Sequence, residues 1–156
     1  MKTTIRIIGL AVALLCAAAC DSSVLYDESH RVDEAGWHLD DRLVYNIKAE
    51  DTTQSYLCCL DIRNTTDYPF SNIYLSITTI YPNGEVAVDT NIEFVLAAPD
   101  GTWLGKASGR YVDGRYPFCH FRFPEVGNYQ FIVGHAMRDT LLRGVKDVGM
   151  YVEREQ

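Results

Sequence analysis

The side chain with the clearest chemistry is the thiol of Cys20, which directly follows three alanines at positions 17–19. A short positive leader comes first, and residues 7–16 form an apolar run. This order is typical of a secretory signal peptide, in which small residues precede the cleavage site. The run is shorter than the roughly 20 apolar residues of a membrane-spanning helix. We therefore expect residues 1–19 to be a lipoprotein signal peptide that is removed, with lipid attached to Cys20.

A lipid on Cys20 would hold the mature chain on a membrane. Each buried methylene contributes roughly 0.8 kcal/mol, and two or more acyl chains anchor stably where one does not. Residues 20–23 form the lipidated cysteine and a short tether, which keeps the domain close to the lipid bilayer. Cleavage after Ala19 by the general signal peptidase, with Cys20 left unmodified, is the alternative. The predicted location is the cell envelope, facing either the periplasm or the cell surface.

Length and charge limit the classes of function that need to be considered. The chain has 156 residues and a net charge of −7, and removal of the leader takes away two cations and no acid. Phosphate binding needs a basic patch, and Lys and Arg do not cluster in this sequence, so no nucleic-acid partner is expected. The mature length fits one domain with a core of its own. We assign that domain to residues 24–156.

Alternating apolar residues recur in short segments along this domain and predict strands. The predicted strands are 24–26, 43–47, 55–63, 73–81, 86–96, 104–112, 116–123, 129–135 and 148–153. Asn-Gly and Asp-Gly pairs at 83–84, 100–101 and 113–114 predict tight turns. Tyr129 lies in a pattern like the tyrosine corner of sandwich domains. The sequence predicts a single antiparallel β-sandwich of about eight strands, either jelly-roll or immunoglobulin-like in its connections.

Motifs of catalysis or metal binding do not occur. The chain lacks a GxSxG elbow, an HExxH helix and a Walker loop. The histidines are scattered at positions 30, 38, 120 and 135, and His120 is expected at the surface of its strand. Asp residues at 40, 41, 61 and 67 lack the spacing of an EF-hand loop and fit solvated turns. We therefore predict a protein that is not an enzyme and that has no metal and no cofactor.

Three cysteines remain after the leader and Cys20, namely Cys58, Cys59 and Cys119. Alternation places Cys58 on the apolar face of its strand and Cys59 on the other face. A disulfide between Cys119 and one member of the adjacent pair is possible in an exported domain, whereas a bridge between the two neighbours would be strained. The pattern favours the alternative, in which Cys58 and Cys119 are small buried apolar residues.

Aromatic residues are the remaining candidates for a binding surface, and the chain has ten tyrosines and two tryptophans. Most are expected in the core or at sheet edges. Tyr68, Phe70 and Trp103 lie in or beside predicted loops, and we predict that they form a surface for a protein partner. Exposed aromatic rings that stack on sugars are the alternative, which would make the chain a carbohydrate-binding lipoprotein of a glycan-uptake system.

Several short runs, taken together and in order, resemble the gliding-motility lipoprotein GldH family of the Bacteroidota. They are residues 63–72 (RNTTDYPFSN), 81–84 (YPNG), 99–106 (PDGTWLGK), 123–125 (FPE), 135–138 (HAMR) and 147–149 (DVG). The resemblance implies an envelope lipoprotein with an accessory part in gliding motility, a system associated with type IX secretion. It implies other cell-envelope proteins as partners, and it implies no enzyme or cofactor. Cys20 is the only functional position that carries over.

Overall fold

The computed structural model describes residues 23–155, and this part of the chain is all-β with no helix. The predicted signal peptide and Cys20 lie outside the described residues. Eight strands have seven or more residues, which confirms the predicted number, and three more are short. The strands are β1 (Val24–Arg31), β2 (Trp37–His38), β3 (Leu43–Ala49), β4 (Tyr56–Thr65), β5 (Asn72–Ile80), β6 (Val86–Val95), β7 (Lys106–Ser108), β8 (Tyr111–Phe121), β9 (Gly127–His135), β10 (Leu141–Leu142) and β11 (Val145–Arg154).

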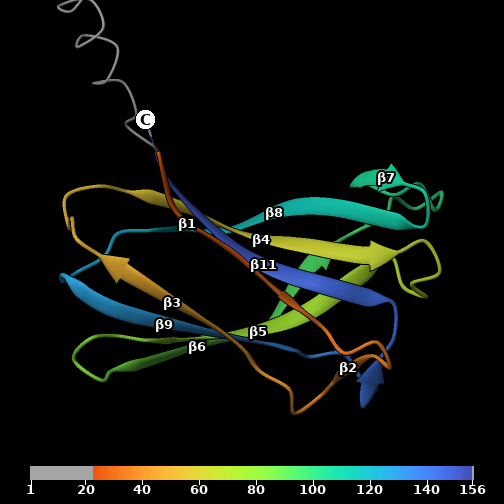
Figure 1. The fold of residues 1–156 in the computed structure, drawn as a ribbon, viewed down its shortest axis with the longest axis horizontal. Coiled ribbons are helices and arrows are strands. Elements are labelled where there is room, and N and C mark those ends of the chain that lie inside the picture. The colour runs from red at the N-terminus through yellow and green to blue at the C-terminus, as the bar shows by residue number, and fades with distance from the viewer. Residues whose placement is uncertain (1–22, 156) are drawn as a thin grey trace, which may run out of the picture.

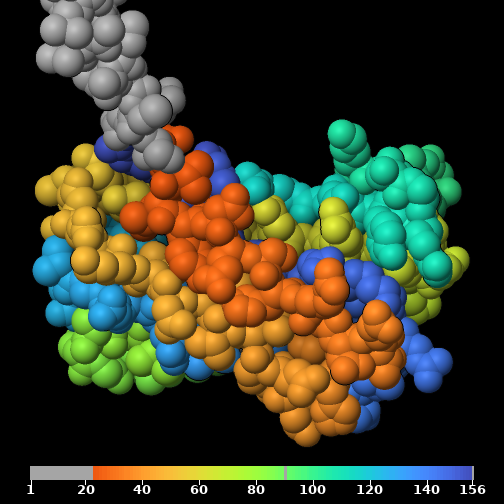
Figure 2. Space-filling model, viewed as in Figure 1, coloured from red at the N-terminus to blue at the C-terminus, as the bar shows by residue number. Residues whose placement is uncertain are grey.

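The long strands form two antiparallel sheets that face each other as the layers of a sandwich (Figure 1). One sheet has five strands in the order β1-β11-β4-β8-β7, and the other has four in the order β3-β9-β5-β6. The strands β2 and β10 pair separately. The segment that contains β1 to β3 runs along one side of the molecule (orange in Figure 2). The predicted antiparallel β-sandwich is confirmed.

The core fills the space between the two sheets, and alternation along each strand supplies it. Side chains of β5 are buried at every second position, and Val148, Met150 and Val152 of β11 are fully buried, as predicted. Rings of Phe121, Phe123, Tyr129 and Phe131 gather at one end of this core with centroids 4.8–6.2 Å apart. The hydroxyl of Tyr129 donates to the carbonyl oxygen of Glu125 at 2.9 Å, as a tyrosine corner does.

Tyr45 links the two layers directly. Its side chain is fully buried, and its hydroxyl, from β3 of the four-stranded sheet, donates to the carbonyl oxygen of Val148 in β11 at 2.7 Å. Because water cannot replace this donor, Tyr45→Phe is expected to lower the free energy of unfolding by about 1–2 kcal/mol. Urea denaturation would measure the change, with the exposed Tyr111→Phe as the control. An unchanged midpoint for Tyr45→Phe would show that the layers do not depend on this bond.

The hairpin between β7 and β8 corrects two predictions. The predicted strand over 104–112 is interrupted at Gly109, whose φ of 61° lies in the left-handed region that favours glycine. The predicted turn at Asp113-Gly114 does not form, because β8 continues through both residues. Gly114 serves packing instead: a Cβ there would lie 2.2 Å from the hydroxyl oxygen of Tyr116, so the ring occupies the space beside the glycine.

The predicted turns at Asn83-Gly84 and Asp100-Gly101 are confirmed. The amide of Gly84 donates to the carbonyl oxygen of Tyr81 at 2.9 Å, and the amide of Gly101 donates to that of Ala98 at 2.9 Å. Both glycines have positive φ, 88° and 86°. Side-chain oxygens of Asn83 and Asp100 accept backbone amides two residues on, which is how Asn and Asp stabilise turns.

Candidate functional site

The loop residues predicted to contact a partner are brought together, although one of them lies in the core. The backbone carbonyl of Ser71 accepts hydrogen bonds from Leu96 and Ala97, and Ala97 pairs with Trp103. The rings of Tyr68 and Phe70 meet edge to face, with their centroids 5.7 Å apart. Phe70 and Trp103 are partly buried against the core.

Tyr68 is not a surface residue, which corrects the position expected for its ring. Its side chain is 4% exposed, and its hydroxyl donates to the backbone carbonyl of Asn72 at 3.0 Å. Gly144 packs on it, since a Cβ at Gly144 would lie 3.0 Å from the Tyr68 Cα. The buried Tyr68 ring therefore anchors the loop to the core, and Phe70 is the more exposed residue of the two.

A hollow of about 560 Å³ opens beside Phe70. Its wall includes Tyr74 of β5 and Met137, and the Met137 Sδ accepts a hydrogen bond from the Tyr74 amide at 3.2 Å. Asn91, at φ 57°, lies at the bulge of β6 and also lines this hollow. Tyr74 belongs to the outer face of the four-stranded sheet, so the hollow is continuous with that face.

The outer face of the four-stranded sheet carries two neighbouring rows of uncharged side chains. Directly paired residues of an antiparallel sheet point to the same face, so the register defines each row. We call these eight residues the uncharged face: Val44, Ile132, Thr78 and Val88 in one row, and Asn46, Gln130, Ile80 and Val86 in the next. Val86 and Val88 are 58% and 57% exposed. The face spans all four strands of an otherwise acidic chain.

Acidic residues lie on and beside β6, the edge strand of this sheet. Glu85, just before β6, and Glu93 within it are exposed. Asp89 is exposed too, but it pairs with the buried Ile77 and so belongs to the inner side of this edge. Lys48 stands beyond the face on β3. Edge strands commonly carry charges that discourage pairing with other chains. None of these charged residues belongs to the two rows of the uncharged face.

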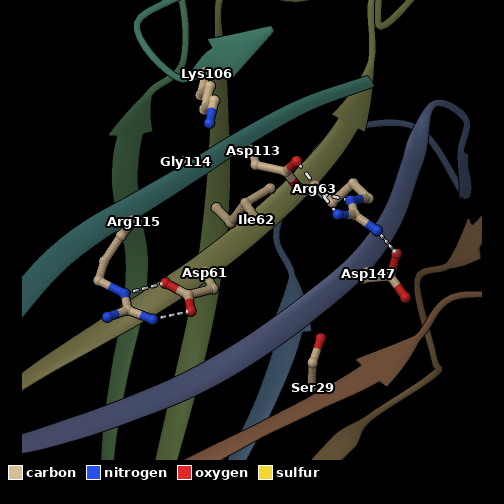
Figure 3. A pocket seen from close by; sticks show the side chains of 9 residues that line it. All are labelled: Ser29, Asp61, Ile62, Arg63, Lys106, Asp113, Gly114, Arg115 and Asp147. Carbon is tan, nitrogen blue, oxygen red and sulfur yellow. Dashed lines mark hydrogen bonds and ion pairs between the residues drawn. The ribbon is translucent and has the colours of Figure 1, made fainter. Parts of the chain in front are cut away.

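The outer face of the five-stranded sheet has the opposite character, because ion pairs cross it. Figure 3 shows Arg115 of β8 paired with Asp61 of β4, and Arg63 of β4 between Asp113 and Asp147. Arg115 donates to both carboxylate oxygens of Asp61 at 2.7 and 2.6 Å, and this bonding raises the pKa of the guanidinium further above its usual range. Each pair is partly exposed, so it contributes at most about 1 kcal/mol.

A shallow hollow of about 690 Å³ lies among these pairs. Gly149 of β11 stands between Ser29 of β1 and Asp61 of β4 in the register, and its missing side chain leaves the sheet surface low there. Lys106 lines the hollow from β7 (Figure 3). The arginines that line it already hold carboxylate partners, so the hollow is built chiefly of internal ion pairs.

The histidines take separate positions, and His120 is exposed as predicted. Its Nδ1 lies 2.6 Å from a carboxylate oxygen of Glu155. Its neighbour Phe118 does not share its outward face, because the register skips Phe118 at the bulge opposite Cys58 and Cys59, and its ring packs on the core. Within residues 23–155, no three His, Cys, Asp or Glu side chains gather closely enough to hold a metal ion.

His135 is buried at 2% exposure against the ring of Trp37. Burial, together with the charge of Arg42, lowers the pKa of its imidazole below the ordinary value. The unfolded chain therefore binds a proton more readily than the folded one, so stability is full above the unfolded pKa of about 6.5 and falls as the pH drops below it.

We expect the free energy of unfolding to decrease between pH 7.5 and pH 5.5, and His135→Leu to reduce this decrease. Urea denaturation at the two pH values would measure it. The exposed His120→Gln variant is the control and should keep the decrease of the parent chain. Equal pH dependence in His135→Leu and the parent would show that another group is responsible.

Most aromatic side chains proposed for sugar stacking lie in or against the core. Among residues 23–155, the most exposed aromatic side chain is that of Tyr111, at 39%. The guanidinium of Arg63 lies 6.0 Å from its ring centroid. The described surface therefore offers a single exposed ring rather than a stacking platform.

Sequence reasoning missed the uncharged face, although a signal for it was present. Thr78, Ile80, Val86 and Val88 flank the Asn83-Gly84 turn at outward positions of their strands, where a solvated sheet would carry charges. Pairing across β9 and β3 could not be read from the sequence, and it is this pairing that joins Ile132 and Val44 to them.

The fold and its two outer faces define the class of protein. It is an all-β sandwich with an ion-paired outer face on one sheet and an uncharged outer face on the other. The family model for the GldH lipoprotein matches residues 24–152. The chain belongs to the GldH lipoprotein family. Membership makes it a lipid-anchored protein of the cell envelope. Among residues 23–155, no helix has the length and hydropathy that crossing a membrane requires.

Two curated relatives match along nearly their whole length. The gliding motility lipoprotein GldH homolog of Christiangramia forsetii is 28% identical over 162 residues, covering 99% of this chain and 98% of the relative. The gliding motility lipoprotein GldH of Flavobacterium johnsoniae is 28% identical over 155 residues, covering 94% of each.

Solved structures are similar only loosely. A structure of infectious bursal disease virus Gt strain matches with a TM-score of 0.34 at 13% identity, and dimeric latent PorU from Porphyromonas gingivalis with 0.35 at 9%. They cover 81% and 83% of this chain, which spans only 30% and 13% of those chains. These likenesses carry no argument about function.

Proposed function

We propose that this chain is an accessory component of a gliding-motility machinery associated with type IX secretion, and that it acts by binding other envelope proteins rather than by catalysis. Cys20 carries the lipid in this proposal. The names of the two relatives support the motility role. The observation that carries the binding role is the uncharged face, with Val86 and Val88 more than half exposed along its edge on β6.

The occupant of the uncharged face is a protein with an uncharged, complementary surface. Burying exposed valines stabilises a complex, whereas leaving them in water gives the free chain no advantage. The exposed acidic residues on and beside β6, Glu85, Asp89 and Glu93, favour a partner with basic residues opposite that edge. Phe70, beside the adjoining hollow, and Trp103, which pairs with Ala97 next to the Phe70 loop, extend the same contact region.

Deleting the gene tests the role, and returning it tests the anchor. A deletion strain is expected to lose surface movement, type IX secretion or both, and the wild-type gene to restore them. Cys20→Ser is expected to yield a protein of unmodified N-terminal mass, released from membranes, that fails to restore them. Normal movement and normal secretion in the deletion strain would overturn the proposed role, and full rescue by a soluble Cys20→Ser protein would overturn the anchor.

A further inference from the structure

Two cysteines far apart in the sequence lie opposite each other in the five-stranded sheet. Cys58 of β4 pairs with Cys119 of β8 in the antiparallel register. Cα atoms of directly opposed residues in such a pair are about 4.5–5.5 Å apart, inside the range of about 4.4–6.8 Å that a disulfide spans. Their side chains point to the same face. Backbone geometry therefore already satisfies the main requirement for a cross-strand bond.

The side chains also meet. The structure holds all three cysteines as thiols, and the Cys58 thiol donates a hydrogen bond to the Cys119 sulfur. The register shifts immediately beside this pair, between Cys58 and Cys59, where Phe118 bulges out of β8. A bulge bends its strand and disrupts the ladder locally.

Cys59 is excluded from the pair by its face. Alternation turns its side chain to the outer side of the sheet, where its opposite residues are Pro117 and Tyr151. It is 2% exposed, and burial raises the pKa of its thiol, which disfavours the reactive thiolate.

We propose that Cys58 and Cys119 form a disulfide in the exported protein and that Cys59 stays a thiol. The inference rests on the location in the cell envelope, an environment in which disulfides persist, and not on the proposed partner. The oxidant is a thiol–disulfide oxidase of the envelope. The bond joins β4 to β8 across 61 residues of chain, which restricts the unfolded state.

The order of steps follows from exposure and hydrogen bonding. Cys119 is partly exposed, and the hydrogen bond from Cys58 lowers the pKa of its thiol, so its thiolate attacks the oxidase disulfide. One oxidase sulfur leaves as a thiolate, and a mixed disulfide forms. Cys58 then loses its proton to solvent and attacks the Cys119 sulfur, which releases the second oxidase thiolate. Two electrons pass to the oxidase, and no other reactant is needed.

Alkylation of the full-length lipoprotein tests the proposal. Cells are lysed into denaturant with a maleimide and without reductant, and the peptides holding the three cysteines are analysed by mass. We expect one maleimide, on Cys59, and a Cys58–Cys119 cross-link lighter than the two thiols by two hydrogens. After reduction all three should be labelled. Three maleimides without reduction, or a cross-link that contains Cys59, would overturn the proposal.

Variants separate the bond from a general effect on folding. Cys59→Ser should keep the cross-link, whereas Cys119→Ser should leave both Cys58 and Cys59 labelled. Reductant is expected to lower the Tm of the wild type and of Cys59→Ser by on the order of 10 °C and to leave that of Cys119→Ser unchanged. An equal response of all three to reductant would contradict the assigned pair.

Discussion

Val88→Lys is expected to lower the affinity for the envelope partner at least tenfold while leaving the fold intact. The side chain is 57% exposed in the free chain, so a lysine there remains solvated and costs little stability. In a complex the ammonium would be buried in an uncharged contact without a partner, which costs several kcal/mol. Binding of the purified partner, measured by calorimetry or surface plasmon resonance, would quantify the loss.

Val126→Lys is the matched control for this substitution. Val126 is 62% exposed, similar to Val88, but it lies in the loop before β9 and not on the uncharged face. Both variants should unfold at nearly the parent temperature. Equal affinity of Val88→Lys and Val126→Lys for the partner would show that the uncharged face does not bind it.

Phe123→Ala is expected to destabilise the domain most, by about 3–5 kcal/mol. The side chain is fully buried, and its ring meets those of Tyr56, Phe121 and Tyr129 at centroid distances of 5.2, 5.0 and 4.8 Å. Truncation removes these contacts and leaves a cavity that the surrounding rings fill only in part. Urea denaturation would measure the loss in the free energy of unfolding.

Val126→Ala provides the control for the cavity, since an exposed truncation away from special features changes stability by at most about 0.5 kcal/mol. If the free energy of unfolding of Phe123→Ala lies within about 1 kcal/mol of that of its parent, the aromatic end of the core can collapse around the missing ring.

Local patterns predicted what depends on neighbouring residues. Alternation along β5 and β11 identified their buried faces, and the pairs at Gly84 and Gly101 marked turns because their backbones need positive φ. The turn predicted at Asp113-Gly114 was wrong, because a glycine can either form a turn or make room for a neighbouring side chain, and the sequence does not distinguish the two. At Gly114 it makes room for the Tyr116 ring, whereas Gly109 forms the turn.

Contacts between distant segments escaped prediction. Tyr68 was expected at the surface because Pro69 and Asp67 surround it, yet Gly144, from the segment before β11, packs on its ring. The uncharged face depends on β9 lying between β3 and β5, an order set by the whole sheet. Single-residue patterns contain no information about which strands become neighbours, so the most informative surface became visible only in three dimensions.

The two outer faces differ in how they interact with water. Ion pairs such as Arg115–Asp61 satisfy one another across the five-stranded sheet, so that surface is stable in water without a partner. Valine and isoleucine side chains on the four-stranded sheet gain only when another surface covers them. A lipid anchor on Cys20 would keep this face close to the membrane and to other envelope proteins.

Photo-crosslinking in living cells tests the central claim most directly. A photoreactive amino acid is placed at position 88 in one strain and at position 126 in another, in the full-length lipoprotein at its native level. We expect a discrete adduct with another envelope protein from position 88 and none from position 126. Identical adducts from both positions, no adduct from position 88, or an adduct with a second copy of this chain alone would contradict it.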